Sequence, residues 1–290
     1  MNHTISNGVL SAVISEQGAE LRSLQMNGIE YMHDGAPTYW GKVAPLVFPI
    51  CGRLFGGKYT WQGKEYEMEL HGFIRYQTLT VSEKSADSIT FTFASNEQTR
   101  KQYPFDFLFS VTYSLDGNSL KTAFRIVNRS QGELPFSVGG HPGFRMPIGG
   151  SGEFTDCYVE FGEPCAAKRI DFSETCFRTG NDTLYDTETL KVIPLRHEMF
   201  DRDAIFLYDT ASALTLRSRA NPHSLRMDFD GFKYVGLWHM PKTDANYICI
   251  EPWTGCPSYD GRIDSFETKE DMTHLEQDGE LSCAFTLTLG

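Results

Sequence analysis

Two segments far apart in the chain supply side chains suited to proton transfer. Glu251 closes the strand-like run 247–251 and is followed by Pro252. The proline favours extended backbone at Glu251 and is expected to end regular strand pairing immediately after it. A carboxylate presented where a sheet opens into a loop can act as a general base. A solvated glutamate at a strand end is the simpler alternative.

The second segment presents a histidine after two glycines. His141 follows Gly139 and Gly140 and precedes Pro142. The glycines permit close approach of backbone or ligand, and the proline restricts His141 to extended geometry. Imidazole has an ordinary pKa of about 6.5, so this side chain can donate a proton at neutral pH. The alternative is a turn histidine bonded to the backbone.

Three other polar residues are candidates for contacts with the hydroxyl groups of a ligand. Arg53 and His71 each lie beside a glycine in apolar surroundings, where an isolated charge is costly unless it meets a partner. A buried ion pair is the alternative for both. Asp203 immediately precedes an apolar run and can accept hydrogen bonds, whereas Asp201 has the character of a turn or surface residue. The pattern leaves open which aspartate contacts the ligand.

Aromatic residues of the last third of the chain are candidates for stacking on a flat ligand face. Trp238, Tyr234 and Trp253 lie in or beside strand-like runs. Aromatic side chains in strands also fill cores, which is the alternative for each of them. Trp238 is the one we retain as a candidate binding residue.

The elements that must position these side chains are β-strands. Apolar residues recur at every second position in many short runs, of which 89–93 and 283–289 are the clearest, and no long window has the spacing of an amphipathic helix. Many short strands between turn signals predict an all-β fold. We expect a large antiparallel β-sandwich, because 290 residues exceed what a small closed barrel needs.

Turn signals indicate how the strands connect. A hairpin is predicted between 109–115 and 120–127 across the Asp-Gly-Asn turn at 116–118, and a second turn at 62–63. The polar, weakly patterned segment 169–196 is predicted to be a long surface excursion rather than a linker. With no internal repeat, we predict a single domain over residues 1–290.

Charge and cysteine usage limit the partners and the compartment. The net charge of −12 comes from 38 acidic and 26 basic residues without a basic run, so neither nucleic acid nor a membrane surface is an expected partner. The seven cysteines are scattered, and we expect small buried side chains rather than disulfides. With no leader-like or membrane-spanning segment, a cytoplasmic protein is predicted, as a monomer or homodimer.

Several cofactor and nucleophile motifs are missing from the sequence. The eight histidines form neither H-E-x-x-H nor H-x-H, and no cysteine belongs to a C-x-x-C pair. A P-loop, a dinucleotide-binding glycine fingerprint and a G-x-S-x-G elbow are also missing. The motifs therefore disfavour metal, nucleotide and serine hydrolase chemistry.

Taken in chain order, these segments resemble the aldose 1-epimerase (galactose mutarotase) family, and more closely its bacterial LacX-like branch. The resemblance covers essentially the whole chain. It rests on Arg53 in Pro-x-x-Gly-Arg-Leu, His71 in Leu-His-Gly, His141 in His-Pro-Gly-Phe, Asp203 in Asp-Ala-Ile-Phe and Glu251 in Ile-Cys-Ile-Glu-Pro-Trp. It implies the galactose mutarotase-like supersandwich, a large antiparallel β-sandwich with the sugar in an open cleft.

The resemblance also implies a reaction and roles for these residues. Glu251 would take the proton of the C1 hydroxyl while His141 protonates the ring oxygen, so that the ring opens and closes on the other anomer. Arg53, His71 and Asp203 would orient hydroxyls. Neither a metal nor an organic cofactor is implied. The expected partner is a free aldohexose such as galactose or glucose.

Three alternatives remain at the level of sequence. A hexose-6-phosphate 1-epimerase is suggested by Arg75, which together with Arg53 could pair with a phosphate. A non-catalytic carbohydrate-binding or sensing module would keep the cleft without turnover. A glycoside hydrolase could use Asp203 and Glu251 as its two carboxylates.

Overall fold

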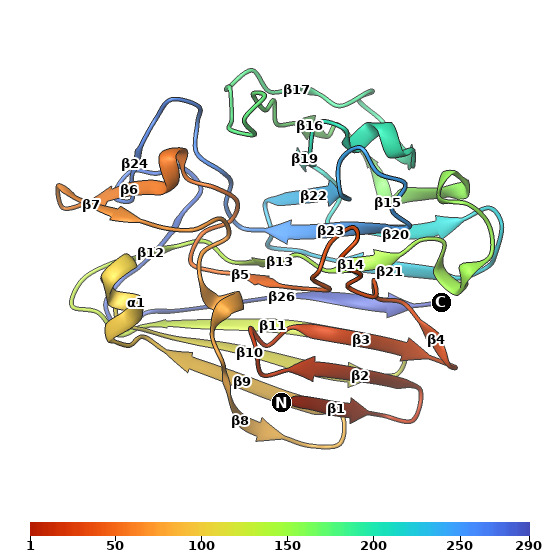
Figure 1. Cartoon of the computed structure of the whole chain (residues 1–290), viewed down its shortest axis with the longest axis horizontal. Helices are drawn as coiled ribbons and strands as arrows, with labels where there is room; N and C mark the ends of the chain where they lie inside the picture. Colours follow the sequence, from red (N-terminus) through yellow and green to blue (C-terminus); the bar gives the residue numbers. More distant parts are fainter.

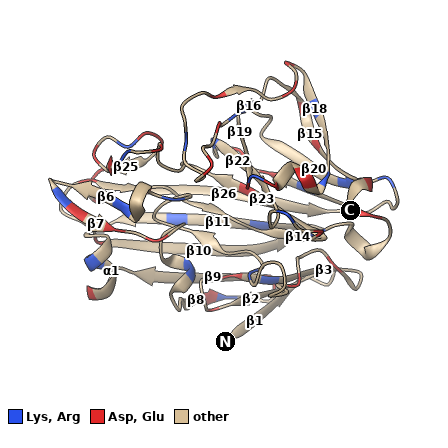
Figure 2. Ribbon diagram, turned by 45° about the horizontal axis from the view of Figure 1, so that its top comes forward, with Lys and Arg blue, Asp and Glu red and all other residues tan.

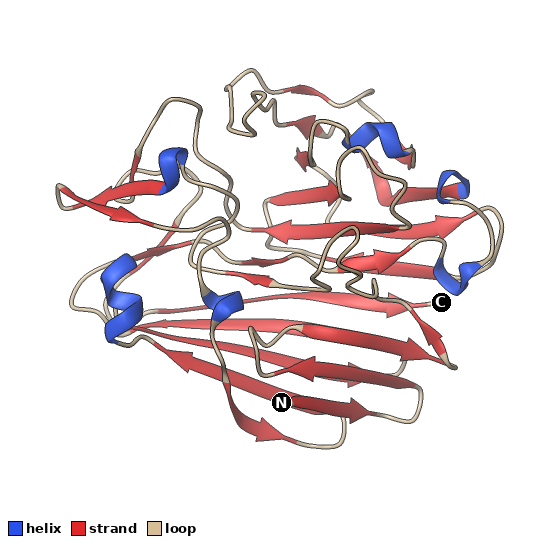
Figure 3. Ribbon diagram, viewed as in Figure 1, coloured by secondary structure: helices blue, strands red, loops and turns tan.

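The structure of the protein, a computed structural model that describes all 290 residues, is built of β-strands joined by loops, with only short helices (Figure 1, Figure 3). The strands form five sheets. The strand pairs are antiparallel apart from the pair β24–β6 in the three-stranded sheet. The predicted all-β, antiparallel fold is therefore confirmed.

The largest sheet has nine strands and crosses the whole molecule. In spatial order it contains β18 (Leu190–Pro194), β15 (Cys157–Cys165), β20 (Ala213–Ser218), β21 (Ser224–Asp228), β26 (Glu280–Leu289), β11 (Ser119–Asn128), β10 (Phe107–Asp116), β9 (Ser88–Ala94) and β8 (Thr80–Lys84). The two clearest alternating runs of the sequence lie in β9 and β26, as predicted.

The second sheet carries the residues of greatest functional interest. In spatial order it contains β17 (Thr183–Leu184), β16 (Lys168–Arg169), β19 (Ile205–Tyr208), β22 (Tyr234–Trp238), β23 (Tyr247–Trp253), β13 (Gly139–Gly140) and β5 (Leu46–Val47), and β14 (Gly143–Arg145) also pairs with β23. The central strand β23 is paired on both edges.

Three smaller sheets complete the strands. They are β1 (Asn2–Ser6), β2 (Leu10–Ser15), β3 (Leu21–Met26) and β4 (Ile29–Glu30); β24 (Asp264–Ser265), β6 (Lys58–Trp61) and β7 (Lys64–Glu67); and β12 (Leu134–Phe136) with β25 (Thr273–Leu275). The helices are short pieces at the ends of the sheets (Figure 3). They are α1 (Glu97–Gln102) and the 3₁₀ turns η1 (Phe55–Gly57), η2 (Ile74–Tyr76), η3 (Ile148–Gly150), η4 (Phe154–Asp156) and η5 (His197–Phe200).

The main core lies between the nine-stranded sheet and the layer formed by the sheets of β1–β4 and of β23. One cluster of 64 buried residues joins side chains of β2, β10 and β23. Phe48, next to β5, has its ring centroid 5.1 Å from those of Phe107 and Phe109 on β10. Burying each such aromatic side chain stabilises the fold by about 1.5–3 kcal/mol. The packing of the two layers confirms the sandwich.

The predicted hairpin and the predicted turn at 62–63 both form, and the turn joins a second hairpin. β10 and β11 pair from Phe107 opposite Asn128 to Asp116 opposite Ser119, with Gly117 in the left-handed region at φ 53°. β6 and β7 meet at a turn in which Gln62 has a φ of 50° and Gly63 a φ of 72°. Both turns require the positive φ angles that are typical of tight hairpins.

The segment 169–196 is more regular than its sequence indicates. Most of its residues up to 189 are exposed or half-buried, as expected of a surface excursion. Its end, however, forms β18, an edge strand of the nine-stranded sheet in which Leu190 and Ile193 are buried. A register shift between Glu160 and Cys165 of β15 breaks the alternation of the pair, so the apolar residues of β18 are not two positions apart. This irregularity hides the strand from period-two pattern analysis.

Charged side chains of both signs are interspersed along the surface elements (Figure 2). Lys58 on β6 and Glu65 on β7, for example, form an exposed ion pair of 2.7 Å. All seven cysteines are free, and Cys51, Cys157, Cys249 and Cys256 are buried. None of the helices is long and apolar enough to span a membrane.

Candidate active site

The register of the second sheet places His141 opposite Glu251. Gly139 of β13 pairs with Trp253 of β23, and Gly143 of β14 pairs with Cys249. Continuing this antiparallel register through the two residues between β13 and β14 brings His141 and Glu251 face to face. The Nε2 atom of His141 lies 3.3 Å from Oε1 of Glu251. Two side chains that are distant in sequence are therefore direct cross-strand neighbours.

Alternation along β23 separates the core from the candidate site. Ile248 and Ile250 belong to the main core, while Cys249, Glu251 and Trp253 point to the other side. The expectation that pairing ends after Glu251 is wrong, because Pro252 pairs with Val235 of β22 and the strand continues to Trp253. Glu251 is thus a buried residue inside a sheet, with 2% of its surface exposed.

The position of Pro252 explains why a proline is tolerated inside a central strand. The amide of Ile250 donates to the carbonyl of Pro142. Pro252, two residues further on, lies opposite Gly140 of β13 in the same register, and the carbonyl of Gly140 accepts a hydrogen bond from the indole of Trp253 instead. A donor is not required there, so its absence costs little.

Glycines beside the two residues provide the space that their side chains occupy. A Cβ atom on Gly139 would meet the carbonyl oxygen of Pro252 and lie 2.6 Å from Cδ1 of Trp253. On the other side of β23, Gly236 faces Glu251, and a Cβ atom there would lie 3.1 Å from the Cβ of Glu251. The prediction that Gly139 permits close backbone approach is confirmed.

All six residues predicted as site residues line one cavity of about 170 Å³ on this face of the sheet. They are Arg53, His71, His141, Asp203, Trp238 and Glu251. Asp201, the competing aspartate, is exposed and does not line this cavity. The geometry thus selects Asp203 as the aspartate that faces the space beside Glu251.

Arg53 and Asp203 neutralise each other at the cavity. Nη2 of Arg53 lies 3.4 Å from Oδ2 of Asp203, and both side chains keep about a third of their surface exposed, at 36% and 29%. Arg53 thus forms an ion pair, as the alternative predicted, but the pair is partly exposed rather than buried, and it faces the cavity. Asp203 has a φ of 93°, an unusual conformation for a residue other than glycine.

His71 is buried, uncharged and held in a strained conformation. Its Nδ1 accepts a hydrogen bond of 3.1 Å from the amide of Gly52, which leaves Nε2 as the donor of the ring. Burial, with the nearby His141 as a second cause, holds the pKa of His71 well below its usual value. Its φ of 63° lies in the left-handed region. Such strain in a cavity-lining residue is typical of functional sites.

Indole rings enclose the cavity. Trp40 lies with its ring centroid 4.8 Å from that of His141 and 5.4 Å from that of Trp238. Trp253 also lines the cavity, but it is almost fully buried and its indole donates to the carbonyl of Gly140. Tyr234 is buried, bonds to Asp271 and does not line the cavity. Of the predicted stacking candidates, Tyr234 is therefore a core residue.

Several cavity residues carry no signal in the sequence. Trp40 comes from an irregular segment before β5, and Phe172 and Cys176 come from the surface excursion. Arg75, singled out only for the phosphate alternative, also lines the cavity. Its Nη2 donates to the carbonyl of Leu70 over 2.6 Å, while its Nε is buried without a hydrogen-bond partner.

Burial drives both members of the His141–Glu251 pair toward their neutral forms. Desolvation lowers the pKa of His141 to about 3. Desolvation, and then the charge of Asp203, raise the pKa of Glu251 well above its usual value. Oε1 of Glu251 and Nδ1 of His141 have no hydrogen-bond partner, and the 3.3 Å approach of Nε2 to Oε1 is not aligned as a hydrogen bond. Perturbed, unsatisfied titratable groups in a cavity are typical of a catalytic centre.

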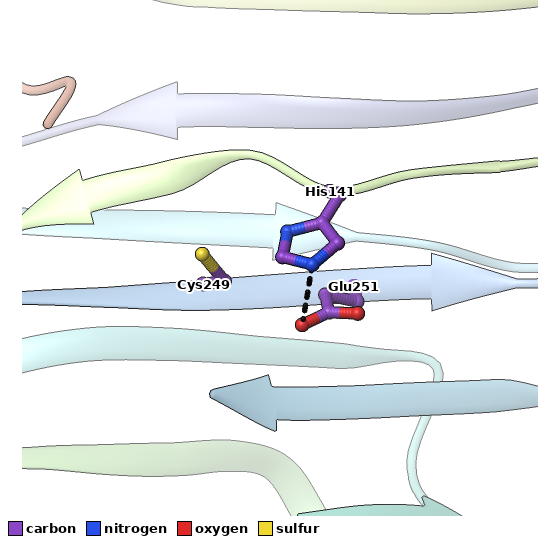
Figure 4. Close-up of side chains that lie close together, drawn as sticks. All are labelled: His141, Cys249 and Glu251. Atoms are coloured by element: carbon purple, nitrogen blue, oxygen red, sulfur yellow. Dashed lines mark ion pairs between the residues drawn. The ribbon is translucent and has the colours of Figure 1, made fainter. Parts of the chain in front are cut away.

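Cys249 adds a third donor atom beside this pair (Figure 4). The ligating atoms of His141, Cys249 and Glu251 lie within 4.8 Å of one another, and all three residues are buried. No local metal-binding motif in the sequence contains this group, because its members come from two separate chain segments.

Comparison with known proteins agrees with the fold and the motifs. The model of the aldose 1-epimerase family matches residues 1–259. The plasmid-encoded and chromosomal LacX proteins of Lactococcus lactis subsp. lactis are 31% and 32% identical to this chain over 265 residues, which is 88% of this chain and 88% of each relative.

Solved structures show the same architecture over the full length. A galactose mutarotase related enzyme from Lactobacillus acidophilus is 35% identical, with a TM-score of 0.95 over 100% of this chain and 97% of its own. A galactose mutarotase-like protein from Lactobacillus casei is 30% identical, with a TM-score of 0.94 over 100% of both chains. The family model, the relatives and the shared fold together show that this chain belongs to the aldose 1-epimerase family.

Proposed function

We propose that this protein is an aldose 1-epimerase that interconverts the α and β anomers of a free aldohexose. The observation that carries the proposal is the placement of His141 opposite Glu251, with Nε2 and Oε1 3.3 Å apart at the wall of a cavity. Anomer exchange requires one group that removes a proton and one that supplies a proton, both within reach of the same sugar. A buried imidazole–carboxyl pair meets this requirement.

The reaction moves two protons and breaks one ring bond. Glu251 removes the proton of the C1 hydroxyl while His141 donates a proton to the ring oxygen, and the C1–O5 bond breaks to give the open-chain aldehyde. Rotation about the C1–C2 bond presents the other face of the carbonyl group. The C5 hydroxyl, which contains the former ring oxygen, then attacks C1 and returns its proton to His141. The C1 oxygen receives a proton from Glu251.

The number of protons in the free site already suits this reaction. A protonated Glu251 with a neutral His141, the state that burial favours, contains as many protons as a carboxylate with an imidazolium. Moving one proton from Glu251 to His141 therefore prepares the base and the acid without exchange with solvent. A sugar hydroxyl that donates to the unpartnered Oε1 of Glu251 stabilises the carboxylate and favours this transfer.

The remaining predicted residues are proposed to position the sugar. Asp203 can accept hydrogen bonds from hydroxyl groups and Arg53 can donate to them, because their mutual ion pair is about a third exposed and lines the cavity. The Nε2–H of His71 is a further donor. Trp238 offers an apolar face, which suits the C–H face of a sugar ring. Positioning of this kind lowers the barrier mainly through proximity.

A hexose 6-phosphate is the second candidate substrate. Arg75 lines the same cavity, and its buried Nε atom has no hydrogen-bond partner. Arg53, also at the cavity, is the other guanidinium that could contact a phosphate. Asp203 already neutralises the charge of Arg53, and Nη2 of Arg75 is occupied by the carbonyl of Leu70, so the attraction for an anionic ligand is weakened and we favour the free sugar.

The proposal includes one domain and a cytoplasmic location. Ile5 and Leu289, near the two ends of the chain, belong to the same cluster of 64 buried residues, which supports one domain over residues 1–290. The seven free cysteines suit a reducing compartment.

Polarimetry of freshly dissolved α-D-glucose and α-D-galactose tests the proposal. We expect the protein to accelerate the approach to anomeric equilibrium and Glu251→Gln to lower the rate by about 10² to 10⁴. Glu65→Gln is the matched control, because Glu65 is an exposed residue of the β6–β7 hairpin. It should keep the full rate.

The outcomes separate the candidate functions. Acceleration confined to glucose 6-phosphate would identify the phosphosugar enzyme. Sugar binding without acceleration would indicate a binding module, and release of an aryl group from an aryl glycoside would indicate a hydrolase. A folded Glu251→Gln variant with normal turnover would remove Glu251 from the mechanism.

A further inference from the structure

Cys249 lies beside the proposed acid–base pair, and the three side chains together are of types that commonly ligate transition metals. Cys249 lies two residues before Glu251 on β23 and points to the same side of the sheet, and His141 comes from the segment between β13 and β14. Figure 4 shows the imidazole of His141 turned toward the carboxyl group of Glu251, with the side chain of Cys249 beside them on the same strand as Glu251. Their donor atoms lie within 4.8 Å of one another.

The three side chains have little contact with solvent, and one of the donor atoms has no hydrogen-bond partner. Oε1 of Glu251 is buried and has no hydrogen-bond partner. The side chains of His141 and Glu251 are 10% and 2% exposed, and Cys249 is fully buried. A polar atom that is buried without a partner typically costs about 1–3 kcal/mol. A cation bound to Oε1 would replace the missing hydrogen bond.

The distances suit a small tetrahedral cation. Bonds of about 2.0–2.1 Å from Zn²⁺ to a nitrogen and an oxygen at the tetrahedral angle hold these two atoms about 3.3–3.4 Å apart. Nε2 of His141 and Oε1 of Glu251 are 3.3 Å apart. A zinc–sulfur bond of about 2.3 Å then requires only a modest inward movement of the thiol. His141 and Glu251 line the cavity, so a fourth position faces the open space.

The donor set also selects the class of metal. One imidazole, one thiolate and one carboxylate suit Zn²⁺ and ions of similar softness, whereas Mg²⁺ and Ca²⁺ prefer oxygen ligands alone. The proposed epimerase reaction routes both protons through His141 and Glu251, which a bound metal would occupy.

We propose that His141, Cys249 and Glu251 form a binding site for Zn²⁺ or a similar soft divalent cation, and that the bound metal inhibits the enzyme. Metal binding stands on the geometry of the three donors, and the inhibition rests on the proposed epimerase function. Cys249 does not line the cavity, so it contacts the metal without contacting the sugar.

Optical titration with Co²⁺ tests the site without reference to activity. Co²⁺ replaces Zn²⁺ in tetrahedral sites and gives a thiolate charge-transfer band when a cysteine is bound. We expect this band in the unmodified protein, its loss in Cys249→Ser, and its displacement by added Zn²⁺. Cys176→Ser is the control, because Cys176 is the thiol that lines the same cavity outside the three-donor group. It should retain the band.

Polarimetry in the presence of Zn²⁺ tests the inhibition. We expect Zn²⁺ to slow anomer exchange and a chelator to restore it, and Cys249→Ser to keep its basal rate while losing affinity for the inhibiting metal by at least about tenfold. A missing charge-transfer band, or one that persists in Cys249→Ser, would overturn the metal site. If the protein catalyses no anomer exchange, the epimerase function fails, and the Co²⁺ spectrum still decides the site.

Discussion

Arg53 and Asp203 are 150 residues apart in the chain, yet they form an ion pair of 3.4 Å at the wall of the same cavity as Glu251. The charge of Asp203 is one cause of the raised pKa of Glu251. Asp203 therefore has two links to the proposed chemistry: it faces the ligand space, and its charge biases the protonation of the base.

Replacing Asp203 tests whether its contact with the ligand and its effect on Glu251 matter more than the loss of one negative charge. We expect Asp203→Asn to lower kcat/KM by about tenfold to a hundredfold through the loss of a hydrogen bond to a charged group. Asparagine accepts the positive φ of this position, so the backbone should be retained. Because the pKa of Glu251 falls when the negative charge is removed, the pH profile should also move to lower pH. Steady-state polarimetry over a range of pH measures both.

Asp201→Asn is the matched control, because it removes the same charge two residues away and outside the cavity. It should change kcat/KM by less than about twofold. Equal losses in the two variants would show that the cavity does not distinguish the two aspartates.

The depressed pKa of His141 predicts a pH-dependent contribution to stability. Its folded-state pKa of about 3 lies below the ordinary value of 6.5, so the unfolded chain binds the extra proton first as the pH falls. Stability from the neutral imidazole is complete above pH 6.5 and is lost toward pH 3. Between pH 8 and pH 5 the loss is about 2 kcal/mol.

Urea unfolding of the unmodified protein and of His141→Gln at these two pH values, with a chelator present, measures this contribution. From pH 8 to pH 5 the unmodified protein should lose about 2 kcal/mol more unfolding free energy than the variant loses. A difference that is the same at both pH values would contradict a depressed pKa.

Adding one methyl group at Gly139 should push the backbone of β13 away from β23 and thereby displace the site residues. The new Cβ of Gly139→Ala would lie 2.6 Å from Cδ1 of Trp253 and against the carbonyl of Pro252, neither of which is a flexible end. We expect a loss of about 1–3 kcal/mol in unfolding free energy and slower anomer exchange, because His141 follows two residues later.

Gly41→Ala provides the comparison, because a Cβ there meets no atom within 4 Å. Its unfolding free energy should change by less than about 0.5 kcal/mol. Chemical denaturation measures both variants, and equal stabilities would argue against the close packing of β13 on β23.

Arg178 joins the surface excursion to the segments that contain Ser258 and Asp271. Its guanidinium is 9% exposed and lies 3.4 Å from Asp271 and 3.6 Å from Asp182. Its backbone amide donates to the carbonyl of Ser258. Arg178→Ala removes one cationic partner from two largely buried carboxylates, and because Asp271 keeps Lys233 and Tyr234, we expect a cost of about 1.5–3 kcal/mol. Because Phe172 lies in the same segment and lines the cavity, KM should also rise.

Arg217→Ala tests whether any lost ion pair has this effect, because Arg217 pairs with Glu160 on the surface. It should cost no more than about 1 kcal/mol and leave KM unchanged. Thermal unfolding and polarimetry of the two variants distinguish an anchoring role of Arg178 from a general loss of surface charge.

Local patterns in the sequence determined the strands and the candidate residues. The alternation of 89–93 and 283–289 depends only on neighbouring residues that must face opposite sides of a sheet, and it predicted parts of β9 and β26. The turn residues at 116–118 and 62–63 likewise fixed two hairpins. The same kind of local information, residue type and immediate neighbours, selected six of the residues that line the cavity.

Only the tertiary structure decided how these residues meet. The opposition of His141 and Glu251 depends on the register of β13 and β14 with β23, which is set by packing between segments more than a hundred residues apart. The same register carries β23 past Pro252 and places Cys249 beside the pair. Trp40 and Phe172 reach the cavity from irregular segments without a periodic pattern. Side-chain periodicity specifies which face a residue occupies, whereas contacts between distant segments specify what it faces.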